Sequence, residues 1–106
     1  MLNEVKTERL HYFVNDLGKI HGIYKDYTVI GNINKYASYH NGKLHGELIL
    51  YLNGNINNHF ICVHGDPIHN LLLNPLSNEE LMLLCLEHGF KRLPDYAQAT
   101  SRNVTI

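Results

Sequence analysis

Histidine and cysteine are the residues of this chain whose side chains could ligate a metal or act as a nucleophile and its base. The sequence holds eight histidines and two cysteines, Cys62 and Cys85. Imidazole and thiolate are common zinc ligands, and an imidazole beside a thiol lowers its pKa. No two histidines show the HxxxH or HExxH spacing of a helical ligand pair, and the cysteines show no CxxC spacing. A site could therefore form only where neighbouring strands bring these side chains together.

Other residue types give no catalytic pattern. Glu79, Glu80 and Glu87 fall at the start or on the exposed side of a predicted helix and form no convergent acid pair. The glycines match neither G-x-G-x-x-G nor a P-loop. The segment "HGDPIH" (64–69) is predicted to be a turn entering a strand. The sequence thus predicts no catalytic residue, no metal site and no cofactor.

The elements that position these residues follow from an internal repeat. "GKIHG" (18–22) recurs as "GKLHG" (42–46), and "GNINK" (31–35) recurs as "GNINN" (54–58). The first copy has one more residue between its two repeated segments than the second copy has. This extra residue places a loop at 28–31, because insertions collect in loops. The repeat therefore indicates two similar supersecondary units.

Asn-Gly pairs predict the chain reversals. Asn41-Gly42 and Asn53-Gly54 tolerate the positive φ angles of two-residue hairpin turns, and strand-forming residues flank both. His64-Gly65 and Leu17-Gly18 occupy similar places. We predict an antiparallel meander of five or six strands, listed by residue range as 8–14, 19–27, 32–40, 43–52, 55–63 and 67–73.

One helix is predicted after the strands. Ser77 can serve as the N-cap, with Glu80 as its partner in a capping box, and Gly89 stands at the C-cap. The segment 77–89 is therefore predicted to be a helix over residues 78–88 with its two caps. It is apolar nearly all round, and one sheet cannot cover it. We expect an exposed strip that forms a homodimer interface, made of Met82, Leu83 and Leu86. Coverage of this strip by residues 90–100 of the same chain is the alternative, and 94–106 is predicted to be a loop-like tail.

Two-residue turns fix a register in which Leu52 pairs with Asn55 and His40 with Lys43. One face then forms the core and receives the helix: Ile33, Ala37, Tyr39, Leu44, Leu48, Leu50, Leu52, Ile61 and Val63. The other face is mixed and aromatic: Ile23, Tyr27, Tyr36, His45, Glu47, Ile49, Tyr51, Ile56, Phe60 and Cys62. We predict that a partner binds this second face, through Tyr27, Tyr36, Tyr51, Phe60 and His45.

The same register predicts a row of side chains across the sheet in the order His21, Ser38, His45, Cys62. Strands lie about 4.8 Å apart, so His21 and His45 would be roughly 9–10 Å apart and could not share an ion. Only His45 and Cys62 would be neighbours, and two ligands do not make a zinc site. A small thiol enzyme using Cys62 with His45 is the alternative function.

The stretch "YHNGKLHGELILYLNGN" (39–55) resembles the MORN repeat, in the Y-x-N-G-K-x-H-G variant common in giant viruses and some bacteria. The resemblance covers residues 12–65 in about two copies, and the first copy departs from it at Asn15-Asp16-Leu17. It implies a row of β-hairpins, turn-stabilising roles for His21 and His45, and a non-enzymatic interaction module without shared catalytic residues. It also implies a viral protein of the virion or the infection stage.

Composition describes one domain over residues 1–106. Hydrophobic residues make up 44%, charged residues 18%, and the formal net charge is -1, which gives no electrostatic case for nucleic acid or a membrane surface. Lys19, Lys25, Lys35 and Lys43 are the basic residues near the repeats, so a lipid-headgroup-binding module is a further alternative.

The N-terminus has no signal-peptide core, and no apolar run approaches about 18 residues. We therefore expect a soluble intracellular protein, in the host cytoplasm or the virion if viral, with two free thiols. Together these features predict an α+β fold, an antiparallel β-meander of MORN-like hairpins with one C-terminal α-helix. The expected function is non-enzymatic protein binding by a homodimer, without a small-molecule substrate.

Overall fold

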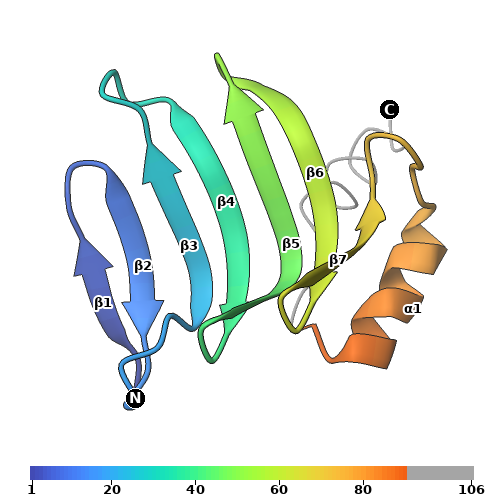
Figure 1. Cartoon of the computed structure of the whole chain (residues 1–106), viewed down its shortest axis with the longest axis horizontal. Coiled ribbons are helices and arrows are strands. Elements are labelled where there is room, and N and C mark those ends of the chain that lie inside the picture. The colour runs from blue at the N-terminus through green and yellow to red at the C-terminus, as the bar shows by residue number, and fades with distance from the viewer. Residues whose placement is uncertain (91–106) are drawn as a thin grey trace.

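The strands of this protein pair in chain order, each antiparallel to the next. The computed structural model describes residues 1–90, and its strands form one seven-stranded sheet in the order β1 to β7 (Figure 1). The strands are β1 (Asn3–Lys6), β2 (Leu10–Val14), β3 (Gly22–Tyr27), β4 (Ile33–His40), β5 (Lys43–Leu52), β6 (Asn55–Val63) and β7 (Asp66–Asn70), and helix α1 spans Asn78–His88. The predicted α+β meander with one C-terminal helix is confirmed. The predicted tail 94–106 lies outside the described residues.

The first strand is absent from the sequence prediction. β1 has four residues, "NEVK", of which Val5 alone is half-buried, so no hydrophobic alternation marks it. A two-residue hairpin loop holds it: the Thr7 N–H donates to the Leu10 carbonyl over 2.8 Å, and the Leu10 N–H donates to Thr7 Oγ1 over 3.0 Å. Pairing with β2, rather than its own composition, makes this segment a strand.

The Asn-Gly turns form as predicted. Asn41 and Asn53 have φ angles of 49° and 53°, and each following glycine has φ 83°. His64 (φ 49°) and its glycine form a third such turn. Positive φ at both central residues defines the turn that matches strand twist, so these dipeptides set the hairpins β4–β5, β5–β6 and β6–β7.

The last predicted strand is shorter than expected. β7 ends at Asn70, whereas the sequence predicted a strand to residue 73. The Asn70 carbonyl accepts from the Asn74 N–H over 2.9 Å, and Asn70 Oδ1 accepts from the N–H groups of Leu72 and Leu73. An Asn side chain that bonds the next backbone N–H groups favours a turn over a strand.

A β-bulge in β6 decides which side chains share a face. Leu52 pairs with Asn55 as predicted, but Leu50 pairs with Asn58, so Asn57 is one residue too many for the ladder. Because side chains alternate with a period of two, one extra residue reverses the faces of all later pairs.

The predicted assignment of β6 side chains to the two faces of the sheet is therefore wrong. Ile61 pairs with Glu47 and Phe60 with Leu48, the reverse of the predicted faces. We call one side the helix-side face; it holds Tyr36, His45, Glu47, Ile49, His59 and Ile61. The other, the opposite face, holds Tyr24, Ala37, Tyr39, Leu48, Leu50 and Phe60.

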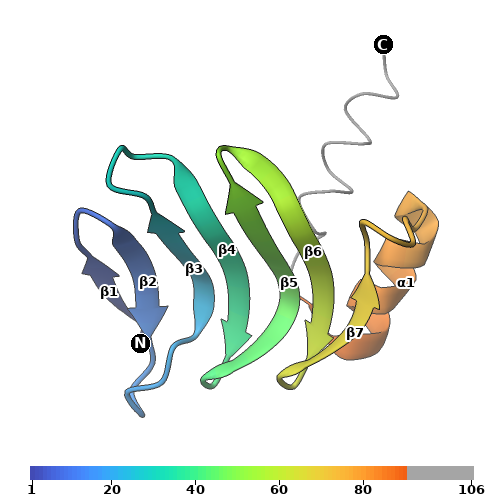
Figure 2. The same ribbon diagram turned by 45° about the horizontal axis from the view of Figure 1, so that its top comes forward.

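Helix α1 packs on the face that was predicted to be free for a partner. Ile61, Leu71 and Leu81 are at most 1% exposed and form one cluster, against which Leu76 and Phe90 pack. The expectation that the helix covers the Leu48 face is thus wrong, because the bulge places Ile61 on the other side. Figures 1 and 2 show α1 beside β7, at the end of the sheet remote from β1.

The helix ends are those that the sequence predicts. Ser77 Oγ accepts from the Glu80 N–H over 3.2 Å, and the Ser77 N–H donates to the Glu80 carboxylate over 3.0 Å. This reciprocal pair lowers the pKa of Glu80. Gly89 closes the helix in the left-handed conformation, at φ 72°. Met82, Leu83 and Leu86 are 51%, 64% and 79% exposed, as the sequence predicts for the outer strip.

Candidate functional site: a groove walled by histidines

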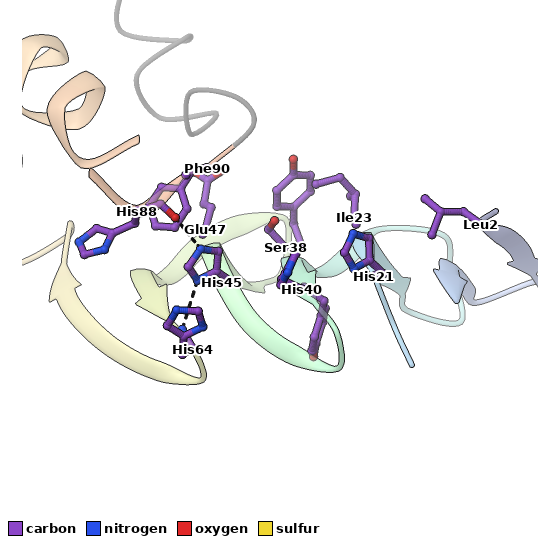
Figure 3. Close-up of a pocket in the computed structure, with 15 residues that line it drawn as sticks. Leu2, His21, Ile23, Ser38, His40, His45, Glu47, His64, His88 and Phe90 are labelled. Atoms are coloured by element: carbon purple, nitrogen blue, oxygen red, sulfur yellow. Dashed lines mark hydrogen bonds between the residues drawn. The ribbon is translucent and has the colours of Figure 1, made fainter. Parts of the chain in front are cut away.

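A groove of about 520 Å³ opens where the helix-side face meets the C-terminal end of α1. Its walls include Ile23 on β3, Tyr36 and Ser38 on β4, His45 on β5, and Phe90 after the helix (Figure 3). Glu47 is the one formally charged side chain among the described residues that line it, and this residue is only 5% exposed. The groove is therefore apolar and aromatic, with imidazoles as its main polar groups.

The repeat positions two of these imidazoles in the same way. The His64 N–H donates to His45 Nδ1 over 3.2 Å, and the Asn41 N–H donates to His21 Nδ1 over 3.1 Å. Each acceptor histidine thus holds the first residue of the next hairpin turn. Both contacts supply a side-chain acceptor to a turn N–H, so His21 and His45 each stabilise a turn.

A row of four histidine rings follows from this arrangement. Ring centroids are 4.7 Å apart for His21 and His40, 5.9 Å for His40 and His45, and 4.6 Å for His45 and His64. The sequence prediction missed His40 and His64 as members of this row. Their positions beside Asn41-Gly42 and before Gly65 are the signal that could have found them, since these turns lie at one end of the sheet.

The chain after the helix closes one side of the groove. Gly89 turns it so that the Phe90 N–H donates to the Cys85 carbonyl over 3.0 Å, and the Phe90 ring lies 5.0 Å from that of His45. The His45 Nε2–H donates to the His88 carbonyl over 2.8 Å. His45 therefore ties the sheet, the next hairpin and the helix end together, and both of its ring nitrogens are occupied (Figure 3).

A buried polar pair lies beneath the groove. The His59 Nε2–H donates to Glu47 Oε2 over 2.6 Å, and the two side chains are 0% and 4% exposed. The sequence prediction missed His59 because the predicted register placed it on the other face. Buried polar groups of this kind fix a packing arrangement as long as they stay paired.

The five residues predicted to bind a partner do not share one surface. Tyr36 and His45 both line the groove. Phe60 pairs with Leu48 on the opposite face. The prediction that it lies beside Tyr36 is wrong because the bulge at Asn57 reverses the faces of the residues that follow it in β6. Tyr27 lies apart, in a second pocket near Arg9, whose Nε–H donates to the Tyr27 carbonyl over 3.1 Å. Tyr51 pairs with Ile56 near the Asn53-Gly54 turn.

The structure does not bring Cys62 and His45 together. Cys62 pairs with Gly46 and neighbours Ile61, so its side chain is on the opposite face, 1% exposed. Burial, with a smaller effect of Asp66, raises the pKa of the Cys62 thiol. The predicted row His21, Ser38, His45, Cys62 is thus replaced by the row of four histidines, and His45 has no free nitrogen to act as a base.

Cys85 shows no activation either. Burial, with a smaller effect of Glu47, raises the pKa of its thiol. Among residues 1–90, no three or more His, Cys, Asp and Glu side chains are placed to hold a metal ion.

Two of the lysines near the repeats lie on different faces. The Lys25 Nζ stands 5.8 Å from the Tyr36 ring centre on the helix-side face, whereas the Lys35 Nζ stands 5.2 Å from the Tyr24 ring centre on the opposite face. They therefore do not form one basic surface. No helix in the described part of the chain has the length and apolar character to span a membrane.

Comparison with known proteins adds no relative: no family model, no curated protein and no solved structure matches this chain.

Proposed function

We propose that this protein is a non-enzymatic protein-binding module whose groove takes an uncharged, apolar segment of a partner protein. The observation that carries the proposal is the lining of the groove, where Phe90, Ile23 and Tyr36 supply apolar surface. Glu47, the one carboxylate among the lining residues within 1–90, bonds to His59. Among the described residues a charged segment would find no exposed counter-ion there, whereas an apolar segment would bury surface against these rings.

The histidine row supports the choice of a peptide over a plain hydrocarbon. His21 Nδ1 accepts from the Asn41 N–H, so the neutral ring carries its proton on Nε2. This Nε2–H is a donor at the groove wall and suits a backbone carbonyl of the bound segment. The hairpin meander, consistent with a hairpin repeat, agrees with the interaction role that the MORN resemblance implies.

The experiment is a selection of phage-displayed random dodecapeptides on the full-length protein, followed by titration of synthetic copies of the recovered peptides. We expect peptides rich in apolar and aromatic residues. Their affinity should fall at least about tenfold for Phe90→Ala and Ile23→Asn, because each substitution removes an apolar wall.

The matched control is Leu83→Asn, an apolar-to-amide change on the exposed strip of α1, which should leave the affinity unchanged. Circular dichroism of each variant checks that the fold is kept. Failure to recover any peptide, or recovery of peptides that bind all three variants equally well, would refute the groove as the binding site.

A further inference from the structure

The outer edge of β1 is the exposed end of the sheet remote from the helix (Figure 1). In the described part of the chain, β1 pairs with β2 alone. The other edge strand, β7, carries Pro67, which cannot donate a backbone hydrogen bond. Edge strands without such protection can pair with another strand.

Register shows which backbone groups β1 presents. Thr7 and Leu10 form a hydrogen-bonded pair at the hairpin, and hydrogen-bonded pairs alternate with non-bonded ones along the strands. Val5, two residues before Thr7, therefore directs its N–H and carbonyl toward Tyr12 on β2. Glu4 and Lys6 direct theirs outward, away from the sheet.

Glu4 and Lys6, whose backbone groups point outward, carry opposite charges and stand one residue before and one residue after Val5. If a second β1 pairs antiparallel with its own Val5 opposite the first, each Glu4 stands opposite Lys6 of the second copy. A slide of the second strand by two residues in one direction puts Glu4 against Glu4, and a slide by two residues in the other direction puts Lys6 against Lys6. Opposite charges directly across a strand pair stabilise it, and like charges destabilise it.

We propose that β1 is a self-association surface, and that two copies join their β1 edges antiparallel about Val5 to form a continuous sheet. The symmetry suits an isologous dimer, since the same strand serves both copies. Four backbone hydrogen bonds per dimer, from the N–H and carbonyl groups of Glu4 and Lys6, and two pairs of opposite charge fix the register. This surface is distinct from the groove and from the exposed strip of α1.

The side chains of the two β1 strands would have neighbours on both faces of the joined sheet. Val5 pairs with Tyr12, whose ring centre lies 5.5 Å from that of Tyr24. The two Val5 side chains would therefore meet between two such tyrosine rows. On the other face, Glu4 Oε2 lies 2.6 Å from His11 Nε2 on β2, so the carboxylate leans toward β2 and turns outward when it meets Lys6 of the second copy.

The test is sedimentation equilibrium of the full chain from about 20 μM to about 1 mM, because an interface of two short strands binds weakly. The wild-type mass should rise from 12.2 kDa toward twice that value. Glu4→Lys and Lys6→Glu should each raise the dissociation constant roughly tenfold or more, since each turns two attractive pairs into repulsive ones.

Charge exchange makes the test specific. An equimolar mixture of the Glu4→Lys and Lys6→Glu chains should form a heterodimer, and the double variant Glu4→Lys/Lys6→Glu should regain self-association. Recovery in the double variant also separates the interchain pairs from the Glu4–His11 contact, which that variant lacks. The matched controls, Glu79→Lys and Lys43→Glu, should dimerise as wild type does.

Three results would overturn the proposal: a wild-type chain that stays at 12.2 kDa throughout, single variants that dimerise like wild type, or a mixture that does not associate. Loss of the dimer in Leu86→Asp, with Glu4→Lys unaffected, would instead assign self-association to the strip of Met82, Leu83 and Leu86.

Discussion

His45 holds the turn that begins at His64: its Nδ1 accepts the His64 backbone N–H over 3.2 Å, although the two residues belong to different hairpins. The same contact joins His21 to Asn41 one repeat earlier. The histidine of each "GKxHG" segment, His21 or His45, thus ties one hairpin of the meander to the next. In His45 the other ring nitrogen also binds the helix end.

The first prediction concerns this contact. His45→Ala should lower the free energy of unfolding by about 1–3 kcal/mol, because a turn N–H and the His88 carbonyl both lose their partner. His45→Asn, whose side-chain oxygen is an acceptor placed much like Nδ1, should recover part of the loss. Urea unfolding measures both. His40→Ala, an exposed histidine of the same row, is the control; an Asn variant no more stable than the Ala variant would contradict the assigned role.

The second prediction concerns the buried pair of Glu47 and His59. Glu47→Leu or His59→Leu alone should cost about 3–5 kcal/mol, because each removes the 2.6 Å hydrogen bond from the buried polar group that remains. The double variant should cost clearly less than the sum of the two single variants. Thermal unfolding of the four proteins gives the cycle, with the exposed Glu87→Leu as control. Additive losses would mean that the pair has no coupling.

The third prediction concerns Cys62 and tests the thiol-enzyme alternative directly. Since burial raises the pKa of this thiol, its thiolate fraction at pH 7 is below that of a free cysteine peptide. In a Cys85→Ser background, disulfide exchange with DTNB should therefore be slower than for the peptide and should accelerate as pH rises through about 7 to 9. A rate above that of the peptide at pH 7 would support an activated nucleophile.

The same shift gives the sign of a pH effect on stability. The unfolded chain, with an ordinary cysteine pKa, loses the Cys62 proton at a lower pH than the folded chain does. Below that ordinary pKa the contribution to stability is fully present, and it is lost as pH rises toward the raised folded value. Replacement by serine removes the titration, so the fall in stability above about pH 8.5 should be smaller in Cys62→Ser.

The fourth prediction concerns the glycine after His45. Gly46 has φ 119°, and a Cβ there would lie 3.1 Å from Ser38 Cβ. Gly46→Ala should therefore cost about 1–3 kcal/mol from backbone strain, plus the cost of the contact. Gly54→Ala, at φ 83° with open space around it, is the comparison for strain alone. Adding Ser38→Gly should recover the steric part; equal losses at both glycines would show that the contact is unimportant.

The sequence by itself determined the features that depend on a few neighbouring residues. The Asn41-Gly42 and Asn53-Gly54 turns follow from the positive φ that these residues tolerate, and Ser77, Glu80 and Gly89 set the helix ends through contacts within one turn. A turn-stabilising role for His21 and His45 was an expectation from the resemblance of their repeat to the MORN repeat. In each case the deciding interaction spans only a few residues, or recurs with the repeat.

Tertiary structure decided what depends on pairing between distant strands. The extra residue Asn57 stands between Ile56 and a second asparagine, Asn58, and only the ladder with β5 shows that it reverses the faces of Phe60 and Ile61. That single reversal determined which face α1 covers and where the groove lies. β1 became a strand through its pairing with β2, because "NEVK" has too little apolar alternation to mark one. Local preferences therefore fixed where the chain turns, while long-range register fixed which side chains meet.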